Sequence, residues 1–139
     1  MIVYESGARD IGPEDLVGFF DGWPTPPSPK SLLRILQNSA LAILAREGRE
    51  VVGFINALSD GVMAVYIPLL EVRASHRHQG IGTELVRRVV AHFDDMYMID
   101  VVCDADVAPF YERLGMGRLM GMAHRNRSAS VLGHGADSP

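Results

Sequence analysis

Apolar residues are spaced along this chain in two ways, and the spacing predicts both strands and helices. Apolar, β-prone runs predict strands at residues 2–5, 41–46, 51–58, 63–72 and 96–103, with a last candidate strand at residues 116–122. Apolar residues three and four positions apart predict helices at residues 13–20, 29–37, 81–93 and 107–114. This order predicts an α/β protein of the α+β kind, with helices packed on a central mixed sheet.

The longest predicted strand, residues 63–72, contains Pro68. Proline has no N–H to donate to a neighbouring strand, so a strand cannot pass through it undisturbed. We therefore predict a bulge or a splay in this strand.

A glycine turn joins this strand to the next helix. The helix begins at the turn, because Ile81, Leu85 and Val89 recur at helical spacing directly after Gly80. The first N–H groups of a helix lack helical partners and lie at the positive end of its dipole. Gly80 and Gly82 allow an anion to approach the backbone closely. The turn is therefore a candidate phosphate site, and the alternative is a glycine turn without a ligand.

Two common phosphate-binding loops are excluded here. No Gly-Lys-Ser/Thr follows the turn, so it is not a Walker A loop, and Leu85 occupies the place of the third glycine of the dinucleotide fingerprint. Three side chains that can carry positive charge flank the turn: His76, Arg77 and His78.

A second motif follows the next predicted strand. Residues 104–116 read D-A-D-V-A-P-F-Y-E-R-L-G-M, in which residues 104–106 are predicted to cap a short helix, residues 107–114, that ends at Gly115. Both motifs together resemble the GNAT superfamily of N-acetyltransferases. The turn, Arg77 to Gly82, resembles its Gln/Arg-x-x-Gly-x-Gly/Ala signature, and the second motif resembles Asn-x-x-Ala-x-x-Phe-Tyr-Glu-x-x-Gly-Phe. The second motif departs from that pattern at Asp104, Val107 and Met116.

The resemblance implies the GNAT fold, with a bulged fourth strand, and acetyl-coenzyme A as co-substrate. It implies that the backbone at Leu70 and Val72 holds the pantetheine arm and the thioester carbonyl. It assigns Tyr111 to the coenzyme A thiolate as general acid. The alternative for Tyr111 and its neighbour Phe110 is that both pack the helix on the sheet. The remaining coenzyme-binding candidates are Arg77, His78, Gln79, Gly80, Ile81, Gly82, Thr83, Asp104 and Phe110.

The acceptor side of the site is less defined by sequence. Glu71 lies on the disturbed strand, where a carboxylate could take the proton of an amine, or be an ordinary solvated residue at a strand end. Tyr66 and Asp104 are weaker candidates for this role, and family members also release the proton through water. Trp23 begins a proline-rich loop, residues 23–29, that either walls the acceptor cleft with Tyr66 or is a plain connector.

Length, composition and net charge limit the number of domains, the kinds of partner and the compartment that we expect. The 139 residues are 47% hydrophobic, which fits one domain, predicted at residues 1–132, with a disordered tail at 133–139. A formal net charge of -4 disfavours a nucleic-acid partner, and a single cysteine gives no disulfide and no metal cluster. The chain has no apolar run of about 20 residues to span a membrane and no signal peptide, so we expect a cytoplasmic protein.

With these observations, the resemblance implies an N-acetyltransferase that transfers an acetyl group from acetyl-coenzyme A to a primary amine of a small molecule. The amine attacks the thioester directly, without a covalent enzyme intermediate and without a metal. Two alternatives remain: a non-catalytic acyl-coenzyme A sensor, and an acetyltransferase acting on a protein or an aminoacyl-tRNA. A homodimer also stays open. No motif identifies the acceptor.

Overall fold

The computed structural model describes residues 1–132, which form one mixed sheet flanked by helices. Neighbouring strands run in the order β1-β2-β3-β4-β6, and β5 also pairs with β3. All pairs are antiparallel except β4 with β6, which is parallel. The predicted fold class is therefore confirmed. The strands are β1 (Ile2–Ser6), β2 (Leu41–Glu47), β3 (Glu50–Ser59), β4 (Ala64–Ile67), β5 (Leu70–Val72) and β6 (Met98–Val101).

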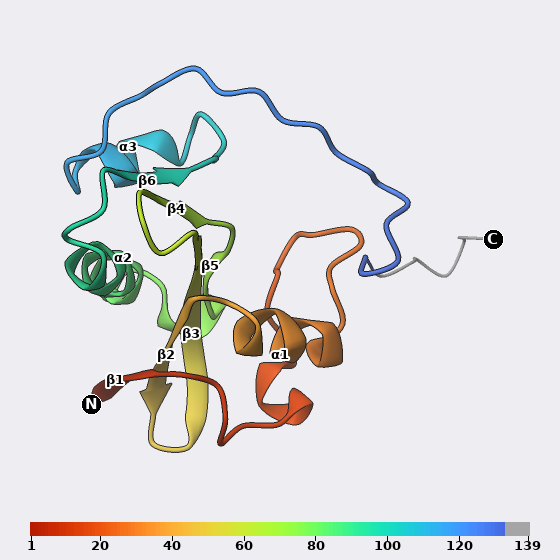
Figure 1. Cartoon of the computed structure of the whole chain (residues 1–139). Coiled ribbons are helices and arrows are strands. Elements are labelled where there is room, and N and C mark those ends of the chain that lie inside the picture. The colour runs from red at the N-terminus through yellow and green to blue at the C-terminus, as the bar shows by residue number, and fades with distance from the viewer. Residues whose placement is uncertain (133–139) are drawn as a thin grey trace.

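Helices cover both faces of the sheet (Figure 1). On one face, α2 (Ile81–His92) packs its apolar side against β2, β3 and β5. On the other, α1 (Pro29–Gln37) and the 3-10 turn η1 (Pro13–Leu16) enclose a second core around Phe54. As the sequence predicts, Ser28 caps α1 by accepting a hydrogen bond from the N–H of Ser31, and Pro29 occupies the first turn.

The short elements η2 (Ala74–His76) and α3 (Ala108–Glu112) lie on either side of α2 along the chain. Neither they nor any other helix within residues 1–132 is long and apolar enough to cross a membrane.

Two sequence predictions about elements are wrong. The helix expected to reach residue 20 ends at Leu16, because Val17 is already extended and Gly18 and Phe20 have positive φ. The strand expected at residues 116–122 is absent, because this segment is extended but pairs with no strand of the described chain. The predicted tail, residues 133–139, lies outside the described residues.

Candidate active site

The sheet splits beyond Pro68. Between the pairs Leu58–Tyr66 and Ile55–Leu70, two residues of β3 face three residues, 67–69, of the opposite segment. This is a β-bulge at the predicted disturbance, and it divides the expected long strand into β4 and β5. β6 pairs with β4 only as far as Ile67 and Val101, so within residues 1–132 no strand lies on the outer side of β5.

Two backbone units of β5 point into this split. The N–H of Arg73 donates to the carbonyl of Val52 at 2.8 Å, and the N–H of Asn56 donates to the carbonyl of Leu69 at 3.2 Å. In an antiparallel pair, hydrogen-bonded residues alternate with residues whose N–H and C=O face the other way. Leu70 and Val72 are therefore the residues of β5 whose backbone groups face away from β3.

Asn56 holds the bulge in place, although sequence reasoning did not single it out. Its side chain is 1% exposed. Its carbonyl oxygen accepts the N–H of Leu69 at 3.0 Å, and its amide donates to the hydroxyl of Ser39 at 3.0 Å. The Ser39 hydroxyl in turn donates to the carbonyl of Ile35 in α1 at 2.7 Å. The buried Asn56 amide thus has hydrogen-bond partners for both its oxygen and its nitrogen, and it connects α1 to the bulge where the sheet splits.

Replacing Asn56 with alanine should lower the free energy of unfolding by about 2 kcal/mol, because the Leu69 N–H and the Ser39 hydroxyl lose their partner in the interior. Asn38→Ala is the matched control, because the Asn38 amide bonds the carbonyl of Arg34 at the exposed end of α1. Urea unfolding measures both variants. Equal losses in both would contradict a special role for Asn56.

The turn before α2 presents free backbone donors. Gly80 caps the helix in the left-handed conformation, φ 81°, and His78 also has a positive φ, 64°. Glu84 is the first helical residue whose N–H finds a partner, the carbonyl of Gly80 at 3.0 Å. The N–H groups of residues 81–83 precede it, and no side chain caps the helix. Such a turn at the positive end of a helix dipole is a fitting site for an anion.

Gly82 brings the turn, the split and the second motif together. A Cβ atom placed on Gly82 would lie 3.5 Å from the ring of Phe110 in α3 and 3.9 Å from the side chain of Val72 in β5. The predicted coenzyme residues of all three segments therefore meet around the start of α2. Phe110 also packs edge-on against Tyr111, with ring centroids 4.9 Å apart.

Tyr111 is buried in the core under α2. Burial, with a smaller effect from nearby Cys103, raises the pKa of its hydroxyl to about 12. The hydroxyl has no hydrogen-bond partner within residues 1–132, so it is available as a donor. The predicted packing role and the predicted donor role of Tyr111 are thus compatible.

Glu71 lies on the opposite face of the sheet from α2. Its carboxylate accepts the N–H of Phe20 at 3.0 Å. Burial raises the pKa of this carboxyl, an effect that the Phe20 N–H and Arg77 reduce and Asp21 reinforces. Phe20 adopts φ 64°, a conformation costly for a bulky residue, and its backbone is thereby turned towards Glu71.

Arg73 positions this same loop. Its guanidinium donates to the carbonyls of Val51, Val17 and Asp15 at 2.6, 2.7 and 3.1 Å, and lies 4.2 Å from the centre of the Phe19 ring. The side chain joins β3 to the segment between η1 and Phe20. Neither Arg73 nor Phe20 carries a recognisable sequence signal, whereas Asn56 stands out as a polar residue in an apolar strand.

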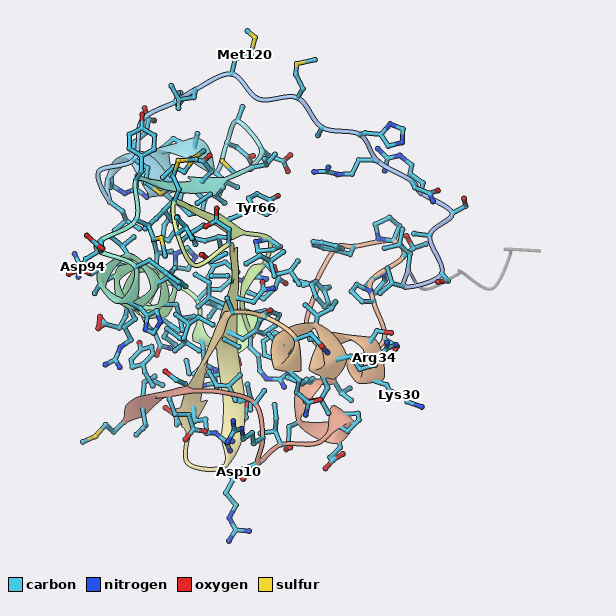
Figure 2. All side chains as sticks on the ribbon, viewed as in Figure 1. Asp10, Lys30, Arg34, Tyr66, Asp94 and Met120 are labelled. Atoms are coloured by element: carbon cyan, nitrogen blue, oxygen red, sulfur yellow. The ribbon has the colours of Figure 1, made fainter. Side chains whose placement is uncertain are left out.

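The remaining predicted site residues either lie close to Glu71 or lie away from both Glu71 and Gly82. Trp23 packs on Phe20, with ring centroids 4.8 Å apart, and Arg77 lies 3.6 Å from Asp21. Tyr66 is exposed on β4, on the side away from α2 (Figure 2). Asp104 is exposed in the turn before α3, where its backbone carbonyl accepts the N–H groups of Val107 and Ala108 at 3.0 and 3.2 Å. The predicted side-chain cap at residues 104–106 is wrong, because Val107 occupies the N-cap position and no side chain bonds there.

Comparisons with known proteins agree with this geometry. The model of the acetyltransferase (GNAT) family matches residues 9–116. A protein from Deinococcus radiodurans R1 assigned as an acetyltransferase is 50% identical, over 89% of this chain and 87% of that chain, with a TM-score of 0.86. A GNAT family acetyltransferase from Streptococcus pneumoniae TIGR4 is 26% identical, over 92% of this chain and 100% of that chain, with a TM-score of 0.75.

An aminoglycoside acetyltransferase from an uncultured soil metagenomic sample shares the fold at 20% identity, over 94% of this chain and 99% of that chain, with a TM-score of 0.65. Because the family model spans most of the sequence, the chain belongs to the GNAT family of acetyltransferases.

Proposed function

We propose that this protein is an N-acetyltransferase that uses acetyl-coenzyme A to acetylate a primary amine of a small molecule. The observation that carries the proposal is the convergence, around Gly82, of the α2 turn, the split edge of β5 and the second motif. This arrangement supplies backbone donors for phosphate at one end and donors for a thioester at the other.

In this proposal the coenzyme pyrophosphate binds the N–H groups at the start of α2, assisted by the exposed guanidinium of Arg77. The pantetheine arm then follows β5 through the split, where it takes the place of the missing strand and bonds to the backbone of Leu70 and Val72. An N–H group there can also stabilise the oxyanion that forms when an amine attacks the thioester carbonyl. Tyr111 donates its proton to the departing thiolate.

The amine approaches from the opposite face of the sheet, where Glu71, Phe20 and Trp23 lie together. Only the neutral amine can attack, so its proton must leave. The raised pKa of Glu71 makes this carboxylate a better base than an exposed one. Glu71 and neighbouring Asp21 also favour a cationic amine over an anionic acceptor.

Replacing Glu71 with glutamine should lower kcat/KM roughly tenfold, below the usual range for a general base because water can accept the proton instead. Since the folded pKa of Glu71 is raised, wild-type activity should rise with pH through that pKa, at a higher pH than an exposed carboxyl would give, and the variant should lack this rise. Glutamine keeps an acceptor for the Phe20 N–H. A pH profile of both proteins, with the exposed Glu14→Gln as control, measures this. If the rise of activity with pH were unchanged in Glu71→Gln, a group other than Glu71 would be responsible for it.

The raised pKa of Glu71 also makes the free energy of unfolding depend on pH. Between the unfolded carboxyl pKa and the higher folded value, the unfolded state releases the proton first, so stability falls as pH rises through this window. Glu71→Gln should therefore remove part of this pH dependence.

Turnover tests the proposal as a whole. Purified protein is incubated with acetyl-coenzyme A and a panel of small amines that includes aminoglycosides, and release of free thiol is followed. Thiol release that depends on the amine supports the enzyme. Tight coenzyme binding by calorimetry without turnover on any amine would favour the acyl-coenzyme A sensor, and turnover only on protein amino groups would favour a protein acceptor.

A further inference from the structure

Arg77 is a charged side chain between the two sides of the candidate active site. It belongs to the turn that leads into α2 and precedes Gly80 by three positions. Its guanidinium, however, lies 3.6 Å from the carboxylate of Asp21, in the loop before α1. The side chain proposed to assist pyrophosphate binding is therefore paired with an acidic group of the acceptor side.

The backbone on both sides of Asp21 is held in place. Phe20 before it and Gly22 after it have positive φ, 64° and 84°. The N–H of Trp23 donates to the carbonyl of Phe20 at 3.0 Å, and the N–H of Phe20 donates to Glu71 at 3.0 Å. The aspartate side chain is short, whereas an arginine side chain is long and has several rotatable bonds. A change of partner therefore moves the arginine and leaves Asp21 where it is.

Glu71 responds to both members of this ion pair. Burial raises the pKa of its carboxyl, the Phe20 N–H and Arg77 lower it, and Asp21 raises it. The charges of Arg77 and Asp21 thus oppose each other at the residue proposed as base. If Arg77 turned away, the negative charge of Asp21 would act on the acceptor side without compensation.

A pyrophosphate is a stronger partner for Arg77 than Asp21 is. The two side chains of the ion pair are 45% and 67% exposed, and their separation of 3.6 Å exceeds the length of a charge-assisted hydrogen bond, about 2.7–2.9 Å. Ion pairs this exposed are weak. A pyrophosphate offers several charged oxygens to the planar guanidinium, beside the uncapped N–H groups of α2. A coenzyme bound there would therefore draw Arg77 away from Asp21.

We propose that Asp21 competes with the coenzyme for Arg77, and that Asp21 helps to select a cationic amine once the coenzyme has taken this arginine. The inference rests on the proposed function, in which the pyrophosphate binds the turn before α2. While Arg77 pairs with Asp21, their charges cancel near Trp23, and a cationic amine gains little from the carboxylate. When Arg77 bonds the pyrophosphate, the unpaired carboxylate attracts the ammonium group. Coenzyme and amine then strengthen each other's binding through one arginine.

Calorimetry with coenzyme A alone tests the competition. Asp21→Asn should tighten coenzyme A binding about two- to fivefold, because Arg77 no longer has a competing carboxylate. In an Arg77→Gln background the same substitution should change the affinity by less than about twofold, because the contested guanidinium is gone. Asp10→Asn is the matched control for the loss of one negative charge, since Asp10 is also exposed and forms no ion pair within residues 1–132.

The fluorescence of Trp23 reports the movement of Arg77. Trp23 is the only tryptophan of the chain, is 44% exposed and lies two positions after Asp21. Saturating coenzyme A should lower its quenching by iodide, an anion, and raise its quenching by caesium, a cation, because a positive charge leaves its surroundings. In Arg77→Gln this change should be much smaller, since only the charge of the coenzyme itself then contributes. Equal changes in both proteins would contradict a movement of Arg77.

Amine kinetics test the second part of the proposal. With an amine that turns over, Asp21→Asn should raise the amine KM about threefold or more, and it should affect the KM more than kcat, because Asp21 attracts the ammonium group and takes no part in the chemical step. An amine KM equal to that of the wild type would exclude Asp21 from amine selection.

The same experiments separate this inference from the proposed function. If Gly82→Glu left coenzyme A binding unchanged, the coenzyme would bind elsewhere, and both proposals would be wrong. If Gly82→Glu weakened binding but Asp21→Asn did not tighten it, the proposed function would stand and the competition would be wrong. The competition would also be wrong if Asp21→Asn tightened binding equally with and without Arg77, because the effect would then be simple repulsion of an anion by a nearby carboxylate.

Discussion

Replacing Tyr111 with phenylalanine should slow the chemical step by on the order of 10²-fold, the lower end for losing a positioned proton donor. Phenylalanine keeps the ring that packs under α2 and against Phe110 and removes only the hydroxyl. Because burial raises the pKa of Tyr111 to about 12, this hydroxyl stays protonated across the neutral and mildly alkaline range. It is therefore present as a hydrogen-bond donor to a departing thiolate throughout this range.

Single-turnover rates with a responsive amine measure this effect. Acetyl-coenzyme A affinity and the free energy of unfolding should change little, because the hydroxyl has no partner to lose within the described residues. Tyr97→Phe is the matched control, since it also removes a tyrosine hydroxyl but at a residue that is 85% exposed. If Tyr111→Phe turned over at the wild-type rate, Tyr111 would have no role as a donor and would serve only in packing the core.

The second large effect is expected at Gly82. Gly82→Glu should weaken acetyl-coenzyme A binding at least about a hundredfold, because it places a negative side chain beside the backbone donors proposed for the pyrophosphate. The space around Gly82 is bounded by Phe110 and Val72 at ordinary contact distances of 3.5 and 3.9 Å. The added side chain must therefore extend into the region that the coenzyme would occupy.

Two further variants at this position separate charge from size. Gly82→Gln has the size of glutamate without the charge, so a smaller loss of affinity than for Gly82→Glu would show that repulsion contributes. Gly82→Ala should leave the fold stable, or stabilise it by roughly 0.5–1 kcal/mol, because alanine is the better helical residue and its Cβ meets no close contact. Calorimetry gives the affinities, and unchanged binding in a folded Gly82→Glu protein would place the pyrophosphate elsewhere.

The three segments proposed to bind the coenzyme show how much local sequence can predict. Gly80 and Gly82 mark the turn, and the helical spacing of Ile81, Leu85 and Val89 places the helix start beside it. Pro68 marks a disturbed strand because it lacks an N–H, and the bulge lies there. These features depend on a few neighbouring residues and on backbone chemistry, so the sequence alone suffices to predict them.

The acceptor side could not be predicted in the same way. Burial raises the pKa of Glu71, and two groups that modify this shift, the N–H of Phe20 that lowers it and Asp21 that raises it, lie about fifty positions earlier in the chain. Phe20 faces Glu71 because of a positive φ, and Arg73 holds the loop by bonds to carbonyls far away in sequence. No local pattern contains such information.

By itself, the sequence determined the mixed α/β architecture, the glycine turn before α2, the disturbed strand and the family, because strand period, helix period and turn chemistry act over short distances. Tertiary structure decided which residues meet: that Asn56 anchors the bulge, that Glu71 and Tyr111 lie towards opposite faces of the split sheet, and that residues 116–122 form no strand. Burial, bulge register and strand partnership depend on segments distant in the chain. A β-prone segment becomes a strand only where another strand offers it an edge.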